Sequence, residues 1–174
     1  RAMDIRPGDM ERMATKFDLI GLNHYSRAIV AHDPSDALSG MRRMSGPGWR
    51  TSFDWEVWPW SIRRLLRRVD ADYGHPPIFI TENGCADPTG PSDDGLVHDA
   101  NRKLYYEGHL GQVARAIDEG VDVRGYFAWS LLDNYEWAEG YTSRFGIVHV
   151  DYATQTRTPK GSYRAFQGML HNTR

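Results

Sequence analysis

A short apolar run that ends in a carboxylate constrains the fold of this chain more than any other feature. Residues 78–81 are Ile-Phe-Ile-Thr, and Glu82, Asn83 and Gly84 follow directly. A run of β-branched and aromatic residues predicts a buried strand, and the Asn-Gly pair predicts a turn at its end. Glu82 is therefore expected at the C-terminal tip of the strand. A lone glutamate there is usually just solvated, but in α/β folds built on parallel strands functional groups gather at this end.

Strand and helix patterns alternate along the chain. Apolar runs predict strands at residues 17–25, 78–82 and 123–129. Capping residues and amphipathic spacing predict helices that begin near Asp9, Pro59, Asp99 and Pro159. Residues 31–50 are expected to form a long irregular loop, and residues 145–152 a short strand or hairpin. This order favours an α/β fold that forms the last part of a (β/α)₈ barrel.

The helix after Pro59 carries the best signal for nucleic-acid binding. Its apolar stripe is expected to consist of Ile62, Leu65, Leu66, Val69 and Tyr73, and four arginines lie largely opposite: Arg63, Arg64, Arg67 and Arg68. A solvated helix face explains these arginines better than a nucleic-acid partner does. The net charge of -2 gives no further electrostatic reason for such a partner. Neither nucleic acid nor a membrane surface is therefore expected.

The length of the chain limits how much of a barrel it can form. A complete (β/α)₈ barrel takes roughly 250 residues or more, whereas this chain has 174. We expect residues 1–174 to form a single partial domain, about half of a barrel. Cys85 is the single cysteine, and no apolar run approaches the roughly 18 residues of a membrane span, so a reduced, cytoplasmic protein is expected. Residues 1–9 show no signal-peptide pattern and resemble a cut end.

A second stretch of sequence strengthens the interpretation of Glu82 as a functional residue. Residues 129–137 are Trp-Ser-Leu-Leu-Asp-Asn-Tyr-Glu-Trp, and residues 140–146 are Gly-Tyr-Thr-Ser-Arg-Phe-Gly. A sugar presents hydroxyls at its edge and C–H groups on its face, so a sugar site needs carboxylates or amides and an aromatic platform. This stretch supplies both. Together with residues 78–84 and the strand Asp-Leu-Ile-Gly-Leu-Asn-His-Tyr at 18–25, it closely resembles glycoside hydrolase family 1, the retaining β-glucosidases and their relatives.

The resemblance implies roles in catalysis for residues at two strand ends. Glu82 takes the place of the catalytic nucleophile of the family's Thr-Glu-Asn-Gly motif. Retaining hydrolysis needs this carboxylate to attack the anomeric carbon and a second carboxyl group about 5–5.5 Å away to protonate the leaving oxygen. Tyr25 resembles the tyrosine that orients the nucleophile, because a phenol hydrogen bond favours and fixes the ionised carboxylate. Asn23 matches a position on the rim of the active site.

The second stretch supplies the residues that the resemblance assigns to the sugar. Trp129 would stack on the sugar ring, and Glu136 would accept hydrogen bonds from the hydroxyls at positions four and six. Trp137 would donate its indole N–H to the hydroxyl at position three, and Phe145 would close the pocket near position six. Any one tryptophan taken alone is more often a core residue, but the joint spacing makes that explanation weak here.

The family also includes 6-phospho-β-glycosidases, which differ at three of these positions. They place Ser, Lys and Tyr where this chain has Glu136, Ser143 and Phe145. A phosphate would meet a carboxylate at Glu136 and would find no lysine. Two like charges in a partly desolvated pocket repel strongly, so an unphosphorylated sugar is the expected ligand.

The chain lacks the Asn-Glu-Pro motif that carries the family's general acid. The glutamates Glu11, Glu56, Glu107 and Glu119 are expected at helix or loop surfaces, without a claim to that role. Two hypotheses follow. The chain is the C-terminal part of a retaining β-glucosidase that needs the N-terminal half for full activity, or it is a non-catalytic sugar-binding or assembly half-barrel. Open sheet edges would make pairing with a complementary half, or self-association, favourable in either case.

No metal site or cofactor is expected. The seven histidines show no pair spaced four residues apart, and Cys85 stands alone. There is also no Gly-rich phosphate loop. The sequence therefore points to chemistry carried by carboxylates alone.

Overall fold

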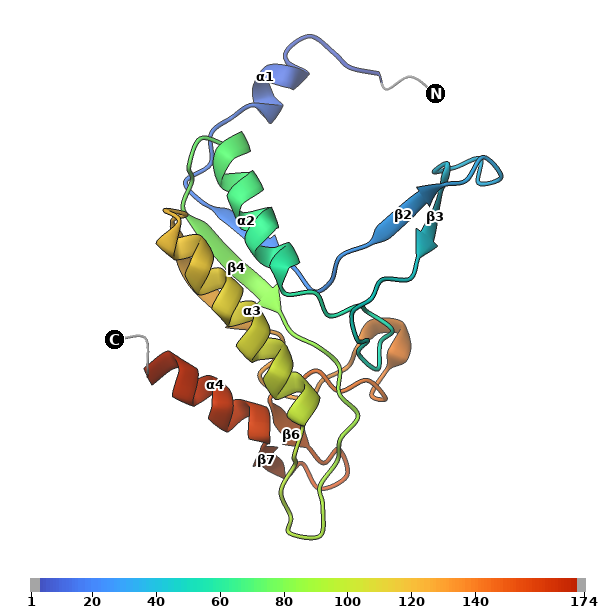
Figure 1. Ribbon diagram of the computed structural model, residues 1–174, viewed down its shortest axis with the longest axis vertical. Coiled ribbons are helices and arrows are strands. Elements are labelled where there is room, and N and C mark those ends of the chain that lie inside the picture. Colours follow the sequence, from blue (N-terminus) through green and yellow to red (C-terminus); the bar gives the residue numbers. More distant parts are fainter. Residues whose placement is uncertain (1–3, 172–174) are drawn as a thin grey trace.

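A parallel sheet forms the centre of the protein. The computed structural model describes residues 4–171 (Figure 1), and its sheet has three strands in the order β1 (Ile20–Asn23), β4 (Ile78–Asn83) and β5 (Val123–Ala128). Both pairings are parallel, so the carboxyl ends of all three strands lie at one edge. The expected α/β order is confirmed, although three strands are somewhat less than half of the eight in a complete barrel.

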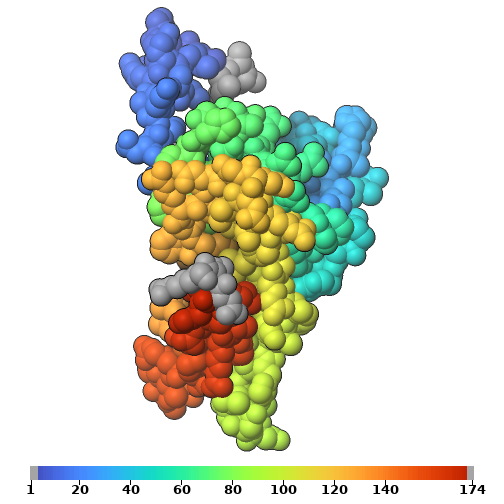
Figure 2. Space-filling model, turned by 60° about the vertical axis from the view of Figure 1, so that its left-hand side comes forward, coloured from blue at the N-terminus to red at the C-terminus, as the bar shows by residue number. Residues whose placement is uncertain are grey.

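Helices cover one face of this sheet. α2 (Trp60–Asp72) connects β1 to β4, and α3 (Ala100–Asp118) connects β4 to β5. In Figure 2 the yellow atoms of α3 lie between the green atoms of α2 and the red atoms of α4 (Gly161–His171). The core between α2, α3 and the sheet consists of buried aliphatic residues: Ile62, Leu66, Val69, Ile78, Ile80, Val113, Ala116 and Val121. Burial of this layer supplies the main driving force for packing the helices on the strands.

The predicted helix after Pro59 is confirmed, with one difference at its end. Pro59 directly precedes α2, and Ile62, Leu66 and Val69 are its buried residues. Tyr73 was expected on the same stripe, but it follows the last helical residue and is 67% exposed. Gly74 comes next with a φ of 75°, a left-handed conformation that ends the helix before the fifth residue of the predicted stripe could reach the core.

A second core lies beneath the loops at the carboxyl end of the sheet. It contains Val57, Cys85, Tyr105, Tyr106, Ile147 and Val148 as its buried members. Phe166 of α4 packs against the ring of Tyr106, with ring centroids 5.5 Å apart. This core therefore joins α3 and α4 to the loops that follow β4 and β5.

The expected irregular loop at residues 31–50 was wrong. β2 (Ile29–His32) and β3 (Met41–Met44) form an antiparallel hairpin that extends away from the sheet (Figure 1). Its tip is a polar turn in which Asp33 accepts hydrogen bonds from Ser35 and the N–H of Asp33 donates to Gly40. These strands are short and largely exposed, so they lack the apolar alternation that would have indicated them in the sequence.

The terminal elements follow the sequence expectations more closely. α1 (Asp9–Met13) begins at Asp9, whose carboxylate accepts the main-chain N–H of Arg6. The strand expected within residues 145–152 appears as β6 (Val148–Val150), and it pairs with β7 (Arg157–Pro159), which lies beyond that segment. Pro159 ends β7 and does not lie in the first turn of α4, which begins at Gly161. The single-domain expectation covers residues 1–3 and 172–174 too, which lie outside the described residues.

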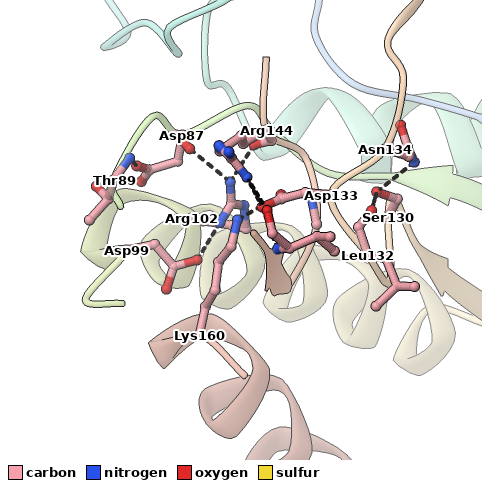
Figure 3. Close-up of polar contacts among 12 residues, drawn as sticks. Asp87, Thr89, Asp99, Arg102, Ser130, Leu132, Asp133, Asn134, Arg144 and Lys160 are labelled. Carbon is pink, nitrogen blue, oxygen red and sulfur yellow. Dashed lines mark hydrogen bonds and ion pairs between the residues drawn. The ribbon is translucent and has the colours of Figure 1, made fainter. Parts of the chain in front are cut away.

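A buried arginine ties α3 to the loops around it (Figure 3). The side chain of Arg102 has no exposed surface and is ion-paired with Asp99. Its guanidinium also donates to three main-chain oxygens, those of Cys85, Asp87 and Arg144. Asp99 was expected to cap α3, but its carboxylate instead accepts hydrogen bonds from Arg102 and from the N–H and hydroxyl of Ser162. A buried charge so fully paired fixes the loops relative to α3.

Within residues 4–171, none of the helices combines the length and the apolar character that crossing a membrane would require.

Two buried histidines make stability depend on pH. His24 bonds to the Ser61 hydroxyl through Nε2, and His109 stacks on Tyr105. Burial lowers the pKa of His24 to about 4 and that of His109 to about 3. Below pH 6.5 the unfolded chain takes up protons that the folded chain does not bind, so stability falls as the pH drops. We expect a loss of about 2 kcal/mol for each histidine between pH 7 and pH 5.

Urea unfolding at pH 7 and pH 5 measures this effect. The His109→Gln variant should lose about half of the pH dependence due to the pair, whereas replacing the exposed His32 by Gln should preserve it. Equal pH dependence in the two variants would contradict the burial of a neutral His109.

Candidate active site

Glu82 and Tyr25 meet at the carboxyl edge of the sheet. Asn23, the last residue of β1, is paired with Glu82 in the parallel register, and the N–H of His24 donates to the Glu82 carbonyl at 2.9 Å. The chain then brings the phenol of Tyr25 over β4, where it donates to Oε2 of Glu82 at 2.5 Å. Burial, and next the hydrogen bond to Glu82, raise the pKa of Tyr25. The phenol is thus kept protonated, as a donor to this carboxylate must be.

Glu136 brings a second carboxyl group to the same place. It lies in the loop after β5, and its pKa is raised by burial, with a further contribution from the charge of Glu82. A hydrogen bond from Trp129 acts in the opposite direction and lowers that pKa. Its Oε2 atom is buried and has no hydrogen-bond partner in the described part of the chain. A buried acceptor without a partner is uncommon, so this oxygen retains an unused capacity to accept a hydrogen bond.

Trp129 is held by its main chain. Its N–H donates to the Asn83 carbonyl at 2.8 Å, and the next residue, Ser130, exchanges main-chain hydrogen bonds with Phe145 and Ile147. The Trp129 carbonyl comes so close to Gly84 that a Cβ there would lie 1.8 Å from the oxygen. The expected turn at the Asn-Gly pair is therefore wrong, since Asn83 belongs to β4 and Gly84 is needed for this close approach.

Two predicted site residues lie in the open. Asn23 is exposed, and its Oδ1 accepts a hydrogen bond from the Thr81 hydroxyl at 2.6 Å. Trp137 follows Glu136 directly and begins the short 3₁₀ helix η1 (Trp137–Glu139). Its side chain is 81% exposed, so no packing within the described residues fixes its orientation toward Glu82.

Phe145, predicted to close the pocket near position six, lies among other aromatic rings. Only 1% of its surface is exposed. Its ring packs edge-on against Tyr25, with centroids 6.3 Å apart, and against Phe53 at 5.5 Å. The ring of Phe145 therefore helps to hold the ring of Tyr25 in place. Other aromatic rings surround Phe145, so neither of its faces is open to a ligand in this structure.

The sequence interpretation missed two aromatic residues that flank the site. Trp55 packs against Tyr25 at 5.1 Å between ring centroids, and Phe53 packs against Trp55 at 4.7 Å. Both lie in the loop before α2. Residues 53–60 contain four aromatic side chains, a density that was the available signal for a functional loop.

Glu56 lies in that loop and was expected at the surface. It is instead 5% exposed and accepts two hydrogen bonds from the Arg27 guanidinium. The hydrogen bonds from Arg27 lower the pKa of Glu56. A carboxyl group held ionised in this way is a poor proton donor, so Glu56 is not suited to act as a general acid.

Asp133 anchors the loop that carries Glu136 (Figure 3). Its Oδ1 accepts from Lys160 at 2.8 Å and from the Gly146 N–H at 3.0 Å, and its Oδ2 accepts from Arg144 at 2.8 Å. Burial alone would raise the pKa of Asp133, but Lys160 and Arg144 outweigh it and lower that pKa. The two ends of the segment 133–146 are thus held together, and Glu136 lies within this segment, close after Asp133.

Among residues 4–171, no three or more His, Cys, Asp or Glu side chains gather closely enough to hold a metal ion.

The close approach at Gly84 can be tested by adding one methyl group. Gly84→Ala forces the Trp129 carbonyl away from β4 and should cost about 1–3 kcal/mol of unfolding free energy. Gly90→Ala is the control, because a Cβ at Gly90 meets nothing within 4 Å. Urea denaturation measures both, and equal stability of the two variants would contradict the contact.

The sequence and the structure are similar to those of known proteins. All 174 residues match the family model of glycosyl hydrolase family 1. The chain is 46% identical to Beta-glucosidase A of Thermotoga maritima, over 94% of this chain and 36% of that protein. It is 43% identical to Beta-glucosidase 4 of Oryza sativa, over 93% of this chain and 37% of that protein.

Solved structures agree with this similarity. The family 1 β-glucosidase from Thermotoga maritima gives a TM-score of 0.90 at 46% identity, covering 94% of this chain and 37% of that chain. The same organism's β-glucosidase in complex with castanospermine gives a TM-score of 0.89 at 44% identity, with the same coverage. The chain spans a little over a third of the length of these relatives. With residues 1–174 all matched by the family model, this chain belongs to glycosyl hydrolase family 1.

Proposed function

We propose that this chain is the C-terminal part of a retaining β-glucosidase and carries its nucleophile and glucose-binding residues. The observation that carries the proposal is the contact between Tyr25 and Glu82 at 2.5 Å, beside a second carboxyl group whose Oε2 atom is unpaired. Relatives named as β-glucosidases support the substrate class. The substrate would be a terminal, non-reducing β-D-glucosyl residue.

In the proposed reaction Glu82 forms a covalent bond to the sugar. Tyr25 occupies Oε2 of the carboxylate, so the other oxygen is left to attack the anomeric carbon while the bond to the leaving oxygen breaks. Water then hydrolyses the glycosyl ester and restores the carboxylate. The proton for the leaving oxygen would come from a general acid outside this chain, because no Asn-Glu-Pro motif occurs in it.

The sugar would be recognised by the loop after β5. Trp129 offers an aromatic platform whose main chain is fixed to β4. The unpaired oxygen of Glu136 is suited to accept a sugar hydroxyl, and the exposed Trp137 could donate to another once a sugar orders it. Asn23 stands at the rim, one strand away from Glu82. Phe145 would act through Tyr25 rather than by touching the sugar.

The two outer strands of the sheet suggest a partner. β1 and β5 are the edges of the three-stranded sheet, and apolar side chains at both are exposed, Leu19 at 48% and Phe127 at 57%. Unpaired edges with apolar flanks favour pairing with further strands. We propose a complementary N-terminal barrel half as the partner, with self-association as the alternative.

A non-catalytic role is the second candidate. The missing Asn-Glu-Pro motif favours it, since a half-barrel that binds sugar without a general acid would not complete the retaining mechanism. Glu136 and Trp129 would then bind sugar while Glu82 remained unused.

Covalent trapping separates the two candidates. A dinitrophenyl 2-deoxy-2-fluoro-β-glucoside needs little protonation of its leaving group, and its fluorine slows hydrolysis of the glycosyl ester. We expect mass spectrometry to find one fluoroglucosyl group on the peptide that contains Glu82. Glu82→Gln should abolish the label, and Tyr25→Phe should slow it by about 10²-fold. Glucose binding without any label in the wild-type chain would favour the non-catalytic candidate.

Charge at Glu136 should decide between a free and a phosphorylated sugar. Replacing Glu136 by Ser together with Ser143 by Lys removes a negative charge and adds a positive one. The affinity for glucose 6-phosphate relative to that for glucose should therefore rise by about 10-fold or more. Calorimetric titration of both sugars measures this ratio. The matched control is Glu139→Ser with Ser143→Lys, because Glu139 is exposed in the same loop. An equal ratio in both double variants would place the sugar pocket elsewhere.

A further inference from the structure

A relay of buried hydrogen bonds runs beneath the candidate site and ends at Tyr25. The Tyr126 hydroxyl of β5 donates to Oδ1 of Asn83 in β4. Nδ2 of Asn83 donates to the Tyr105 hydroxyl of α3 at 2.9 Å, and that hydroxyl donates to the main-chain oxygen of Tyr25 at 2.9 Å. Three elements of the fold, β5, β4 and α3, are thereby linked to the residue that contacts Glu82.

The direction of this relay is fixed by its acceptors. The carbonyls of Tyr25 and His24 can only accept, so the Tyr105 hydroxyl must donate to the first and the amide nitrogen of Asn83 must face the second. Asn83 and Tyr105 are both fully buried. No water competes at such a place, so a polar group that lost its partner there would stay unpaired.

The relay holds the segment after β1 against β4. Asn83 binds the His24 carbonyl with its side chain, while the N–H of His24 binds the Glu82 carbonyl with its main chain. Tyr105 then holds the Tyr25 carbonyl from the helix side. The backbone of Tyr25 is fixed by bonds that involve neither the Tyr25 side chain nor the Glu82 side chain.

We infer that Asn83 and Tyr105 are positioning residues for the nucleophile, because they fix the backbone from which the Tyr25 phenol reaches Oε2 of Glu82. This inference rests on the proposed function of Glu82. Neither residue touches the sugar or the reacting atoms. They act through Tyr25, whose hydrogen bond occupies one oxygen of the carboxylate and leaves the other free to attack.

The next residue on α3 provides a matched control. Tyr106 is as fully buried as Tyr105, but its hydroxyl donates to the Trp129 carbonyl at 3.3 Å. It therefore leads to the sugar platform and not to the nucleophile. Tyr105→Phe keeps the ring that stacks on His109 at 3.9 Å and removes only the hydroxyl, and Tyr106→Phe is the same chemical change one residue along.

The first experiment measures the rate of trapping by the fluoroglucoside over a range of reagent concentrations. Tyr105→Phe should lower the maximal rate by about 10-fold or more while the half-saturating concentration stays the same, because the phenol no longer holds the attacking carboxylate firmly and the sugar contacts are intact. Tyr106→Phe should leave the maximal rate in place. Tyr126→Phe, at the far end of the relay, should give a smaller loss of maximal rate than Tyr105→Phe. Equal losses in the Tyr105 and Tyr106 variants would overturn the inference.

A second readout needs no catalysis. A buried phenol that donates to a carboxylate gives a proton resonance far downfield, which Tyr25→Phe would assign. This resonance should move or vanish in Tyr105→Phe and persist in Tyr106→Phe. If the wild-type chain takes up no label, the proposed function fails, and the resonance alone still decides whether Tyr105 positions Tyr25. A resonance unchanged in Tyr105→Phe would overturn the inference even where labelling succeeds.

Discussion

Parallel pairing of β4 with its two neighbours is the constraint on which the rest of the structure depends. Because all three strands run in one direction, the residues that follow them emerge at one edge of the sheet. Residues as distant in sequence as Tyr25, Glu82 and Trp129 are brought together in this way. An antiparallel partner on either side would have sent one of these side chains to the opposite end of the sheet.

The helix-covered face of the sheet and the loops at its carboxyl edge are stabilised by different kinds of interaction. The helix-covered face is an aliphatic layer, whereas the loops at the carboxyl edge are held by the second core together with buried polar groups. Arg102 holds the loops after β4 and β5 through three carbonyls, and Asp133 clamps the segment that bears Glu136. Hydrogen bonds are directional where apolar contacts are not. A site that must place carboxylates within a few tenths of an ångström is suited to such anchoring.

The candidate site combines fixed and unfixed parts. Glu82 and Tyr25 are joined to each other and to the sheet, and Trp129 is fixed through its main chain. Glu136 retains an unpaired buried oxygen, and Trp137 stands in solvent. The fixed parts belong to the proposed covalent step, and the unfixed parts belong to recognition of the sugar, where a ligand can supply the missing partner.

The sequence by itself determined the order of strands and helices, the strand end at Glu82 and membership of a family. The apolar periodicity of α2 and the apolar run of β4 are local properties, so they could be recognised without the fold. The hairpin β2–β3 was missed because its short, exposed strands carry no such pattern. Only the tertiary structure decided that Phe145 and Glu56 are buried and that Gly84 allows the close approach of the Trp129 carbonyl. It also decided that the hydrogen bonds of Asn83 and Tyr105 lead to Tyr25. Each of these facts depends on contacts between residues distant in sequence, and the pattern of neighbours along the chain contains no record of such contacts.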